Sequence, residues 1–289
     1  MKNICLVANL DRDIDGRYLR EVIDWLKKQG ISAIVGEREA KVINNDAGVA
    51  FGDELYEKSD MVVSLGGDGT MIAASKKASV YNVPVMGINL GTLGYLTDAA
   101  GGKAGLSALE KVVRGDYKTE KRMMIEAAIF DQDRNVVKDG LLALNDVCVL
   151  RGNVPKAKVY SLQINGECLD KYKSDGIIVA TPTGSTAYNL SAGGSILSPD
   201  IECVSITPIC SHNLSSRPLV VSAHDIISIK AFGDYWKDNE NEVIVSLDCQ
   251  ENVGLREGYS VQIQKAKNYA THIKTNDLGF YDIIRMKMH

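Results

Sequence analysis

The segment 63–71 reads VSLGGDGTM, in which three glycines surround one aspartate. Glycine loses more backbone freedom on folding than any other residue, so this repetition indicates a sharp turn or a closely approaching ligand. We name residues 66–70 the first glycine loop, and its predicted phosphate-contacting residues are Gly66, Gly67, Gly69 and Thr70. A carboxylate repels phosphate, so Asp68 is better suited to accept the proton of an attacking hydroxyl or to position a metal. The alternative is an Asp-Gly turn in which Asp68 caps the following helix.

Two further polar segments follow apolar runs. Residues 89–98 read NLGTLGYLTD, and this second glycine loop would lie beside the first if their strands are parallel. Residues 143–150 read ALNDVCVL, where Asn145 and Asp146 interrupt apolar neighbours. This pair either hydrogen-bonds a polar ligand or forms a β-bulge or a water-facing pair, and its residue types leave both interpretations open.

The segment 175–194, DGIIVATPTGSTAYNLSAGG, places a hydroxyl-rich turn after an apolar strand. Short neutral hydroxyl groups suit ribose and phosphate oxygens, and an ordinary loop is the alternative. The hydroxyl groups are those of Thr181, Thr183, Ser185, Thr186 and Ser191. The segment lacks the GxSxG turn of a serine nucleophile, and no histidine follows it in a recognisable triad pattern.

The N-terminal third must position the glycine loops. Strands are predicted at residues 3–9, 31–35, 60–65 and 83–89, and helices at 14–29, 70–80 and 106–115. Alternation of strands and helices predicts a parallel α/β domain, in which ligands bind at the carboxyl ends of the strands. Both glycine loops follow such strand ends.

The pattern changes to short strands near residue 116, which predicts a β-rich second domain. One of these strands is predicted to run continuously over 136–150 (VVKDGLLALNDVCVL). We therefore predict an α/β domain at 1–115, a β-rich domain at 116–264, and a tail at 265–289 that packs back on the first domain.

Composition excludes several classes of protein. The net charge of -4 argues against a general nucleic-acid binder, and no apolar stretch approaches the roughly 18–20 residues needed to span a bilayer. The N-terminus does not read as a signal peptide, so we expect a cytoplasmic protein without a membrane partner. The six cysteines and four histidines show no metal-ligand spacing, so no metal-ligating residues are predicted.

In combination, these segments resemble NAD kinases. The resemblance is carried by GGDGT at 66–70, NLGTLGYLTD at 89–98, Asn-Asp at 145–146, SDGIIVATPTGSTAYNLSAGG at 174–194, PICSHNLSSRPLV at 208–220 and DCQ at 248–250. Their order and spacing extend over nearly the whole chain. GGDGT also occurs in lipid kinases and phosphofructokinase-type enzymes, whereas TPTGSTAYNLSAGG is the discriminating segment.

The resemblance implies a two-domain fold with the active site between an α/β domain and a β-rich domain. It implies transfer of the γ-phosphoryl group of ATP to the 2′-hydroxyl of the adenosine ribose of NAD, which gives NADP. Mg²⁺ or another divalent metal, held mostly by the phosphates, is implied as well. A homodimer or homotetramer whose subunits share the NAD site is also implied.

Residue roles follow from the same resemblance. Asp68 would be the general base, and Gly69 would lie against the dinucleotide. Asn145 and Asp146 would hold adenine and ribose, and Asp175 would contact the nicotinamide carboxamide or its ribose. The other implied NAD-binding residues are Lys156, Lys173, Thr186, Ala187, Tyr188, Asn189, Leu190, Ser191, Cys210 and Gln250.

Two other functions are compatible with a GGDG loop but fit the rest of the sequence less well. A lipid kinase sharing the GGDG loop would need an apolar acceptor groove and membrane association, and the hydroxyl-rich segment 181–191 disfavours it. A non-catalytic NAD(H)-binding sensor would need a spoiled first glycine loop, whereas Asp68 and its glycines are intact.

Overall fold

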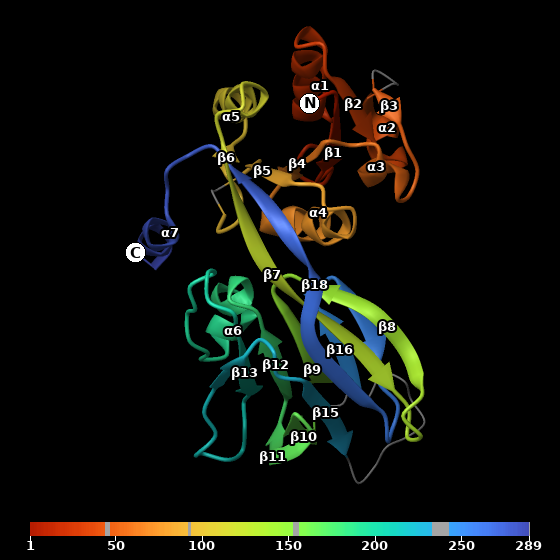
Figure 1. Ribbon diagram of the computed structural model, residues 1–289, viewed down its shortest axis with the longest axis vertical. Helices are drawn as coiled ribbons and strands as arrows, with labels where there is room; N and C mark the ends of the chain where they lie inside the picture. Colours follow the sequence, from red (N-terminus) through yellow and green to blue (C-terminus); the bar gives the residue numbers. More distant parts are fainter. Residues whose placement is uncertain (44–46, 92–93, 153–155, 233–242, 289) are drawn as a thin grey trace. The chain divides into compact units, whose positions relative to one another are not determined.

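The computed structural model describes residues 1–289 apart from 44–46, 92–93, 153–155, 233–242 and 289 (Figure 1). The chain forms two compact units. The first unit comprises Met1–Lys121 and Asn268–His289, and the second comprises Arg122–Lys267. Strands and helices alternate in the first unit, whereas strands predominate in the second. The predicted fold class, an α/β domain with a β-rich C-terminal domain, is confirmed.

A parallel sheet lies at the centre of the first unit. Its strand order is β5 (Val85–Asn89), β4 (Met61–Gly66), β1 (Asn3–Ala8), β2 (Ser32–Val35) and β3 (Gly48–Val49), with β6 (Ala99–Ala100) beside β5. Every residue of β4 and β5 is buried, as expected for strands covered on both faces. The last part of β18 (Ser260–Lys274) also joins this sheet, where His272 pairs with Val85 in parallel.

Helices cover both faces of this sheet. In Figure 1, α1 (Arg17–Lys28) and α5 (Lys103–Val113) lie on one face and α4 (Asp68–Val80) lies on the other. The helical spacing predicted for Leu19, Val22, Ile23 and Leu26 of α1 is confirmed, because all four are buried. Together with α5 and the strands they form one apolar core. The first unit also contains α2 (Glu37–Ile43), α3 (Glu54–Glu57) and α7 (Phe280–Met288).

The second unit is built on two groups of antiparallel strands. One group runs in the order β11 (Glu167–Ser174), β10 (Lys158–Ile164), β15 (Ile227–Phe232) and β18, and the β7 (Lys118–Phe130)–β8 (Val136–Ala143) hairpin pairs with β18. The other runs in the order β14 (Leu219–Ser222), β13 (Cys203–Ile209), β12 (Gly176–Ala180), β9 (Asp146–Arg151), β16 (Val243–Leu247) and β17 (Glu251–Gly254). The short helices η1 (Thr183–Thr186) and α6 (Tyr188–Ser191) follow β12.

Residues 136–150 do not form the single strand that the sequence predicts. Strand β8 ends at Ala143 in one sheet, and β9 begins at Asp146 in the other. The Asn145–Asp146 pair therefore lies at the corner where the chain changes sheets, and the β-bulge interpretation is wrong. Asp146 is only 2% exposed, so the water-facing interpretation is wrong for this residue as well.

Candidate active site

Asp68 is the first residue of α4 and lies half-buried just after β4. Its Oδ2 accepts a hydrogen bond from the backbone N–H of Tyr95 at 2.8 Å, and its Oδ1 accepts one from Leu96 at 3.1 Å. The capping interpretation is wrong, because Gly67 occupies the N-cap position and α4 has no side-chain cap bond. Two backbone donors instead orient the carboxylate, and each oxygen has a second lone pair that can accept a substrate proton.

The second glycine loop lies beside the first within the first unit, as predicted. Strands β4 and β5 pair in parallel with Gly66 opposite Asn89, and the N–H of Leu90 donates to the Gly66 carbonyl at 3.2 Å. Glycine is required at position 94, because a Cβ there would overlap the Asp68 carboxylate. The second loop thus provides both the donors and the space for Asp68.

Asp98 anchors the second glycine loop to the end of β18. Its buried carboxylate accepts a hydrogen bond from the Thr275 N–H at 3.1 Å and from the Asn276 side-chain amide at 2.9 Å. The Lys274 ammonium group lies 3.4 Å from the same carboxylate. The loop that orients Asp68 is therefore tied to residues 274–276.

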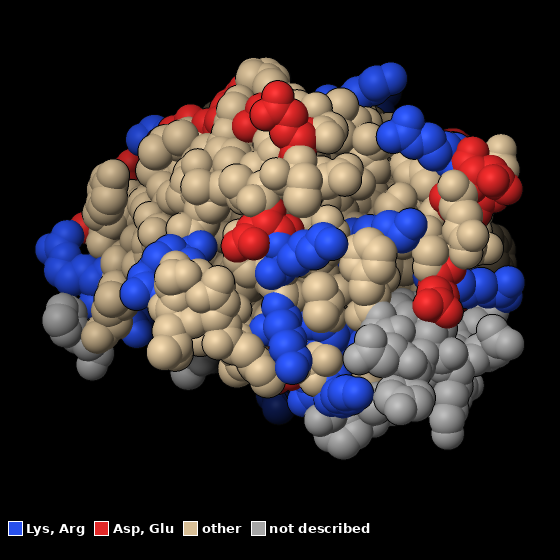
Figure 2. Space-filling view, turned by 90° about the horizontal axis from the view of Figure 1, so that it is seen from below, with Lys and Arg blue, Asp and Glu red and all other residues tan. Residues whose placement is uncertain are grey.

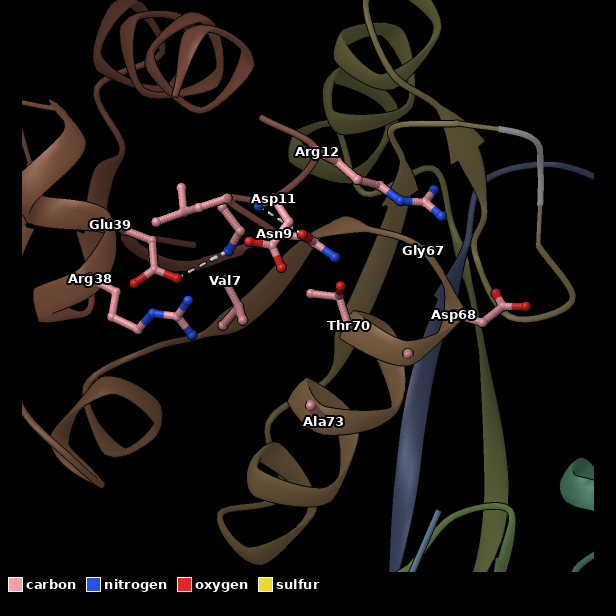
Figure 3. A pocket seen from close by; sticks show the side chains of 13 residues that line it. Val7, Asn9, Asp11, Arg12, Arg38, Glu39, Gly67, Asp68, Thr70 and Ala73 are labelled. Atoms are coloured by element: carbon pink, nitrogen blue, oxygen red, sulfur yellow. Dashed lines mark hydrogen bonds between the residues drawn. The ribbon is translucent and has the colours of Figure 1, made fainter. Parts of the chain in front are cut away.

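A pocket of about 490 Å³ opens beside the first glycine loop within the first unit (Figure 3). Its lining includes Gly67, Asp68, Gly69 and Thr70. The end of β1, the segment after it, the start of α2 and Ala73 of α4 supply the rest of its walls, and Figure 3 shows Arg12 and Arg38 at different sides of it. A glycine-lined pocket with basic groups nearby is chemically suited to a phosphorylated ligand.

In the second unit, Asp248 fixes the Asn145–Asp146 corner. Its carboxylate, in a residue that is 7% exposed, accepts hydrogen bonds from the backbone N–H groups of Leu144, Asn145 and Asp146 at 3.0, 2.7 and 3.1 Å. The backbone N–H of Asp248 in turn donates to the Asp146 carbonyl at 3.0 Å. One buried carboxylate thus orders three consecutive peptide groups.

The position of Asp248 follows from the tight turn between β16 and β17. Asp248 and Cys249 have φ values of 52° and 56°, and the N–H of Gln250 donates to the Leu247 carbonyl at 2.9 Å. Positive φ at both central residues is typical of a type I′ hairpin turn.

The hydroxyl-rich segment packs against the same corner. The Thr181 N–H donates to the Asn145 carbonyl at 2.8 Å, and the Thr181 hydroxyl donates to the Leu144 carbonyl at 2.6 Å. A Cβ at Gly184 would overlap the backbone of Asn145, so only glycine allows this close approach. Thr181 and Ser185 are fully buried and their hydroxyl groups bond to carbonyls, so the prediction that they serve a ribose or phosphate is wrong.

Asp175 connects β11 and β12, and its carboxylate pairs with Arg151. The Arg151 Nε donates to Asp175 Oδ1 at 2.7 Å. Burial raises the pKa of Tyr188, and electrostatic interactions with three cysteine side chains, including that of Cys210, and with Asp175 raise it further. The predicted site residues Asp175, Tyr188 and Cys210 therefore lie near one another in the second unit.

Two family models match most of the chain. The ATP-NAD kinase N-terminal domain matches residues 4–117, and the ATP-NAD kinase C-terminal domain matches residues 144–275. The chain belongs to the ATP-NAD kinase family. The NAD kinase of Caldanaerobacter subterraneus subsp. tengcongensis is 35% identical over 288 residues, which cover 100% of this chain and 99% of that protein.

Solved structures of ATP-NAD kinase relatives agree with this assignment. Yeast NADH kinase complexed with NADH matches with a TM-score of 0.86 and 28% identity, covering 99% of this chain and 86% of that chain. The NAD kinase from Archaeoglobus fulgidus in complex with ATP matches with a TM-score of 0.73 and 26% identity, covering 99% and 97%. The predicted family and the predicted NAD kinase activity are confirmed.

The kinase-family residues on η1 and α6 differ in exposure. Tyr188 and Ser191 are exposed, and Thr186, Ala187 and Leu190 are half-buried. Asn189, however, is fully buried, and its Oδ1 accepts a hydrogen bond from the Thr207 hydroxyl at 2.6 Å. The Asn189 side chain therefore supports the segment from inside the unit.

The two lysines taken from the kinase family, Lys156 and Lys173, are exposed. Lys173 lies on β11 opposite Val159 of β10, which in turn lies opposite Phe232 of β15. Figure 2 shows lysine and arginine side chains gathered on the face that it presents, with acidic side chains among them. Gln250 and Cys210 are exposed too, and Cys210 has a φ of 47°, which is uncommon outside glycine.

Two negative findings hold for the part of the chain that the structure describes. No helix there is long and apolar enough to cross a membrane. Nor do those residues form a group of three or more histidine, cysteine, aspartate or glutamate side chains that could hold a metal ion.

Asp146 should make stability depend on pH. Burial raises its pKa from 3.8 to about 6, a hydrogen bond from the Cys148 thiol lowers it, and the Asp248 carboxylate raises it. Because the folded state binds the proton more tightly than the unfolded state, this contribution to stability is complete below about pH 4 and is lost as the pH rises through about 6.

We expect the Asp146→Asn variant to lose this dependence. Between about pH 5 and pH 7.5, the unaltered protein should lose about 1 kcal/mol more unfolding free energy than the Asp146→Asn variant. Urea unfolding at both pH values measures the difference. Parallel pH dependence in the two proteins would contradict the raised pKa.

The sequence did not identify Arg12, Arg151 and Asp248 as site residues. Arg12 follows the carboxyl end of β1, and a polar segment at a parallel strand end is a usable signal. Asp248 stands in the DCQ segment, but its three hydrogen bonds are to residues about a hundred positions earlier. Arg151 has no local sequence signal, because its partner Asp175 lies 24 residues later, in the connection between β11 and β12.

Proposed function

We propose that the chain transfers the γ-phosphoryl group of ATP to the 2′-hydroxyl of the adenosine ribose of NAD, with Asp68 as general base. The observation that carries the proposal is the Asp68 carboxylate, which two backbone N–H groups orient beside a glycine-lined pocket. Membership of the ATP-NAD kinase family supports both substrates.

The proposed step needs one base and a positioned donor. The Asp68 carboxylate takes the proton of the 2′-hydroxyl group while the hydroxyl oxygen forms a bond to the γ-phosphorus. The bond between this phosphorus and the oxygen that bridges it to the β-phosphate breaks, and ADP leaves. Phosphoryl transfer depends mainly on positioning and charge stabilisation, so glycine loops and a single carboxylate are sufficient contributions from this unit.

The second unit would bind NAD at the Asn145 corner. The Asn145 Oδ1 atom is buried and has no hydrogen-bond partner within the described structure. An unsatisfied buried acceptor costs about 1–3 kcal/mol, so a ligand donor such as the adenine amino group would relieve it. Asp146 and Asp175 offer carboxylate oxygens to ribose hydroxyl groups or to the nicotinamide carboxamide.

The remaining proposed NAD contacts come from the family resemblance. They are Gly69, Lys156, Lys173, Thr186, Ala187, Tyr188, Asn189, Leu190, Ser191, Cys210 and Gln250. For Asn189 the contact would have to be made by the backbone, because the side chain is buried. A homodimer or homotetramer that shares the NAD site belongs to the same proposal, and sedimentation equilibrium measures it.

A divalent metal fits this proposal as an ion carried by the phosphates of ATP. Mg²⁺ is usually bound by substrate phosphates with one or two carboxylates, and the described residues do not form a dedicated metal cage. The bound ion would neutralise phosphate charge. The chain's own residues would orient the two substrates and accept the proton.

A coupled assay tests the function. Purified protein is mixed with ATP, Mg²⁺ and NAD, and NADP-specific glucose-6-phosphate dehydrogenase reports the NADP formed. Because the yeast relative is an NADH kinase, NADH is run as a second acceptor and its product is identified by mass spectrometry. If the folded protein binds NAD but forms no phosphorylated product, the kinase assignment is wrong and the assignment as a non-catalytic NAD(H)-binding sensor takes its place.

A further inference from the structure

Arg12 lies over both glycine loops of the first unit. Its Nη1 atom is 3.6 Å from the position that a Cβ would take at Gly67 and 2.8 Å from the corresponding position at Gly91. It lines the pocket that contains the first glycine loop and a second pocket of about 420 Å³ that contains Gly91. Figure 3 shows its side chain extending from the turn after β1 toward Gly67.

The turn that carries Arg12 is held by its own hydrogen bonds. The backbone N–H groups of Arg12 and Asp13 donate to the Asn9 carbonyl at 3.1 and 3.0 Å. The Asp13 carboxylate accepts the N–H groups of Tyr18 and Leu19 at the start of α1, at 3.1 and 2.9 Å. The backbone of Arg12 is therefore fixed without any contribution from its side chain.

The Arg12 guanidinium group has no hydrogen-bond or ion-pair partner among the described residues. Three carboxylates line the same pocket, and two of them are engaged elsewhere: Asp68 accepts the N–H groups of the second glycine loop, and Glu39 accepts the Ala8 N–H at 3.2 Å. The third, Asp11, forms no ion pair with Arg12. By contrast, the nearby Arg20 donates to the Val42 carbonyl at 2.9 Å. An exposed guanidinium group on a fixed turn thus lies next to Gly67 and Gly91, which have no side chains.

We infer that Arg12 binds the non-transferred phosphates of the donor nucleotide and so positions its γ-phosphorus relative to Asp68. This inference rests on the proposed function. Guanidinium presents a planar fork of N–H donors that matches phosphate oxygens, and glycines 67 and 91 leave space for those oxygens next to the backbone. Arg12 would contact the donor alone, because the residues proposed for NAD lie in the second unit, apart from Asp68 and Gly69.

Steady-state kinetics with both substrates tests the assignment. The KM for ATP of Arg12→Gln should rise by about 10- to 100-fold, the range expected for loss of hydrogen bonds to a charged group. The KM for NAD should stay within about twofold. Arg12→Lys should recover part of the loss, because lysine keeps the charge but not the fork. The matched control is Arg17→Gln, since Arg17 is also exposed but does not line the pocket.

Calorimetric titration of ADP with Mg²⁺ measures the same contact without turnover. Arg12→Gln should weaken ADP binding by about the factor seen in the KM for ATP. Circular dichroism checks that the variant is folded, which we expect because no described residue bonds to the Arg12 side chain. Unchanged ADP affinity and an unchanged KM for ATP in Arg12→Gln would overturn the inference while leaving the kinase assignment intact. An inactive unaltered protein would instead overturn the proposed function.

Gly91→Ala provides an independent variant. The added methyl group would crowd Arg12 Nη1, which can move because it is the end of a flexible side chain, and Gly91 does not need a positive φ. We expect Gly91→Ala to raise the KM for ATP in the unaltered protein and to have no further effect in Arg12→Gln. Fully additive effects of the two substitutions would contradict the role of Arg12.

Discussion

Asp68→Asn is expected to lower kcat by about 10²- to 10⁴-fold, the usual contribution of a positioned general base. The dissociation constant for NAD should change much less, because an amide keeps the size of the carboxylate but cannot accept the 2′-hydroxyl proton. The coupled NADP assay measures kcat, and calorimetric titration measures NAD binding. A near-normal kcat in Asp68→Asn would show that Asp68 is not the general base.

The asparagine variant also perturbs the second glycine loop. Its side-chain amide would place an N–H group against the backbone N–H of Tyr95 or Leu96, which now donate to the carboxylate. Thr97→Val separates this effect from the loss of the base. The Thr97 hydroxyl accepts the Gly94 N–H at 3.0 Å, so valine loosens the loop but keeps the Asp68 carboxylate. A loss of kcat as large in Thr97→Val as in Asp68→Asn would assign the effect to loop geometry.

Gly184→Ala is expected to damage the proposed NAD site and the stability of the second unit. The methyl group would overlap the backbone of Asn145, which hydrogen bonds from Thr181 and to Asp248 hold in place. Forcing an extra methyl group into a packed site costs about 1–3 kcal/mol of unfolding free energy. NAD affinity should fall about tenfold or more, because displacement of Asn145 and Asp146 removes at least one hydrogen bond to NAD.

Urea unfolding and calorimetric titration of NAD measure the two effects. Gly48→Ala is the matched control, because a Cβ at position 48 would meet its nearest neighbour, the Ala33 carbonyl, at an ordinary contact distance of 3.5 Å. The control should be close to neutral in both measurements. If Gly184→Ala keeps full stability and NAD affinity, the close approach of Gly184 to Asn145 is not required.

The parallel sheet could be predicted because its strands bear strong signals. The run DMVVSL is apolar throughout, and β4 occupies Met61–Gly66 within one residue of the prediction. The sequence predicts the start of α4 at residue 70, two residues too late, because the glycine at position 69 has a low helix propensity. The helix begins at Asp68, whose side chain is held by the distant second glycine loop, and such a tertiary contact has no local signal.

Elements with little burial have no clear signal in the sequence. Helix α2 buries only Ile43, and β11 buries only Tyr172 and Ser174, so neither presents a clear apolar period. The corner at Asn145 cannot be predicted for the opposite reason, because apolar residues on both sides of it resemble one continuous strand. The glycine loops could be predicted from composition, whereas Arg12 and Asp248 act on partners that only the folded chain brings close.

The anchoring of Asp98 has a consequence for how the chain is made on the ribosome. Domains generally fold from the N-terminus as synthesis proceeds. The loop that orients Asp68, however, is fastened through Asp98 to Lys274, Thr275 and Asn276. When the parallel strands of the first unit have emerged from the ribosome, residues 274–276 have not yet been synthesised, so this attachment is still missing. In the nascent chain, the loop that orients the Asp68 carboxylate would therefore be anchored only at the end of translation, after the second unit has been synthesised.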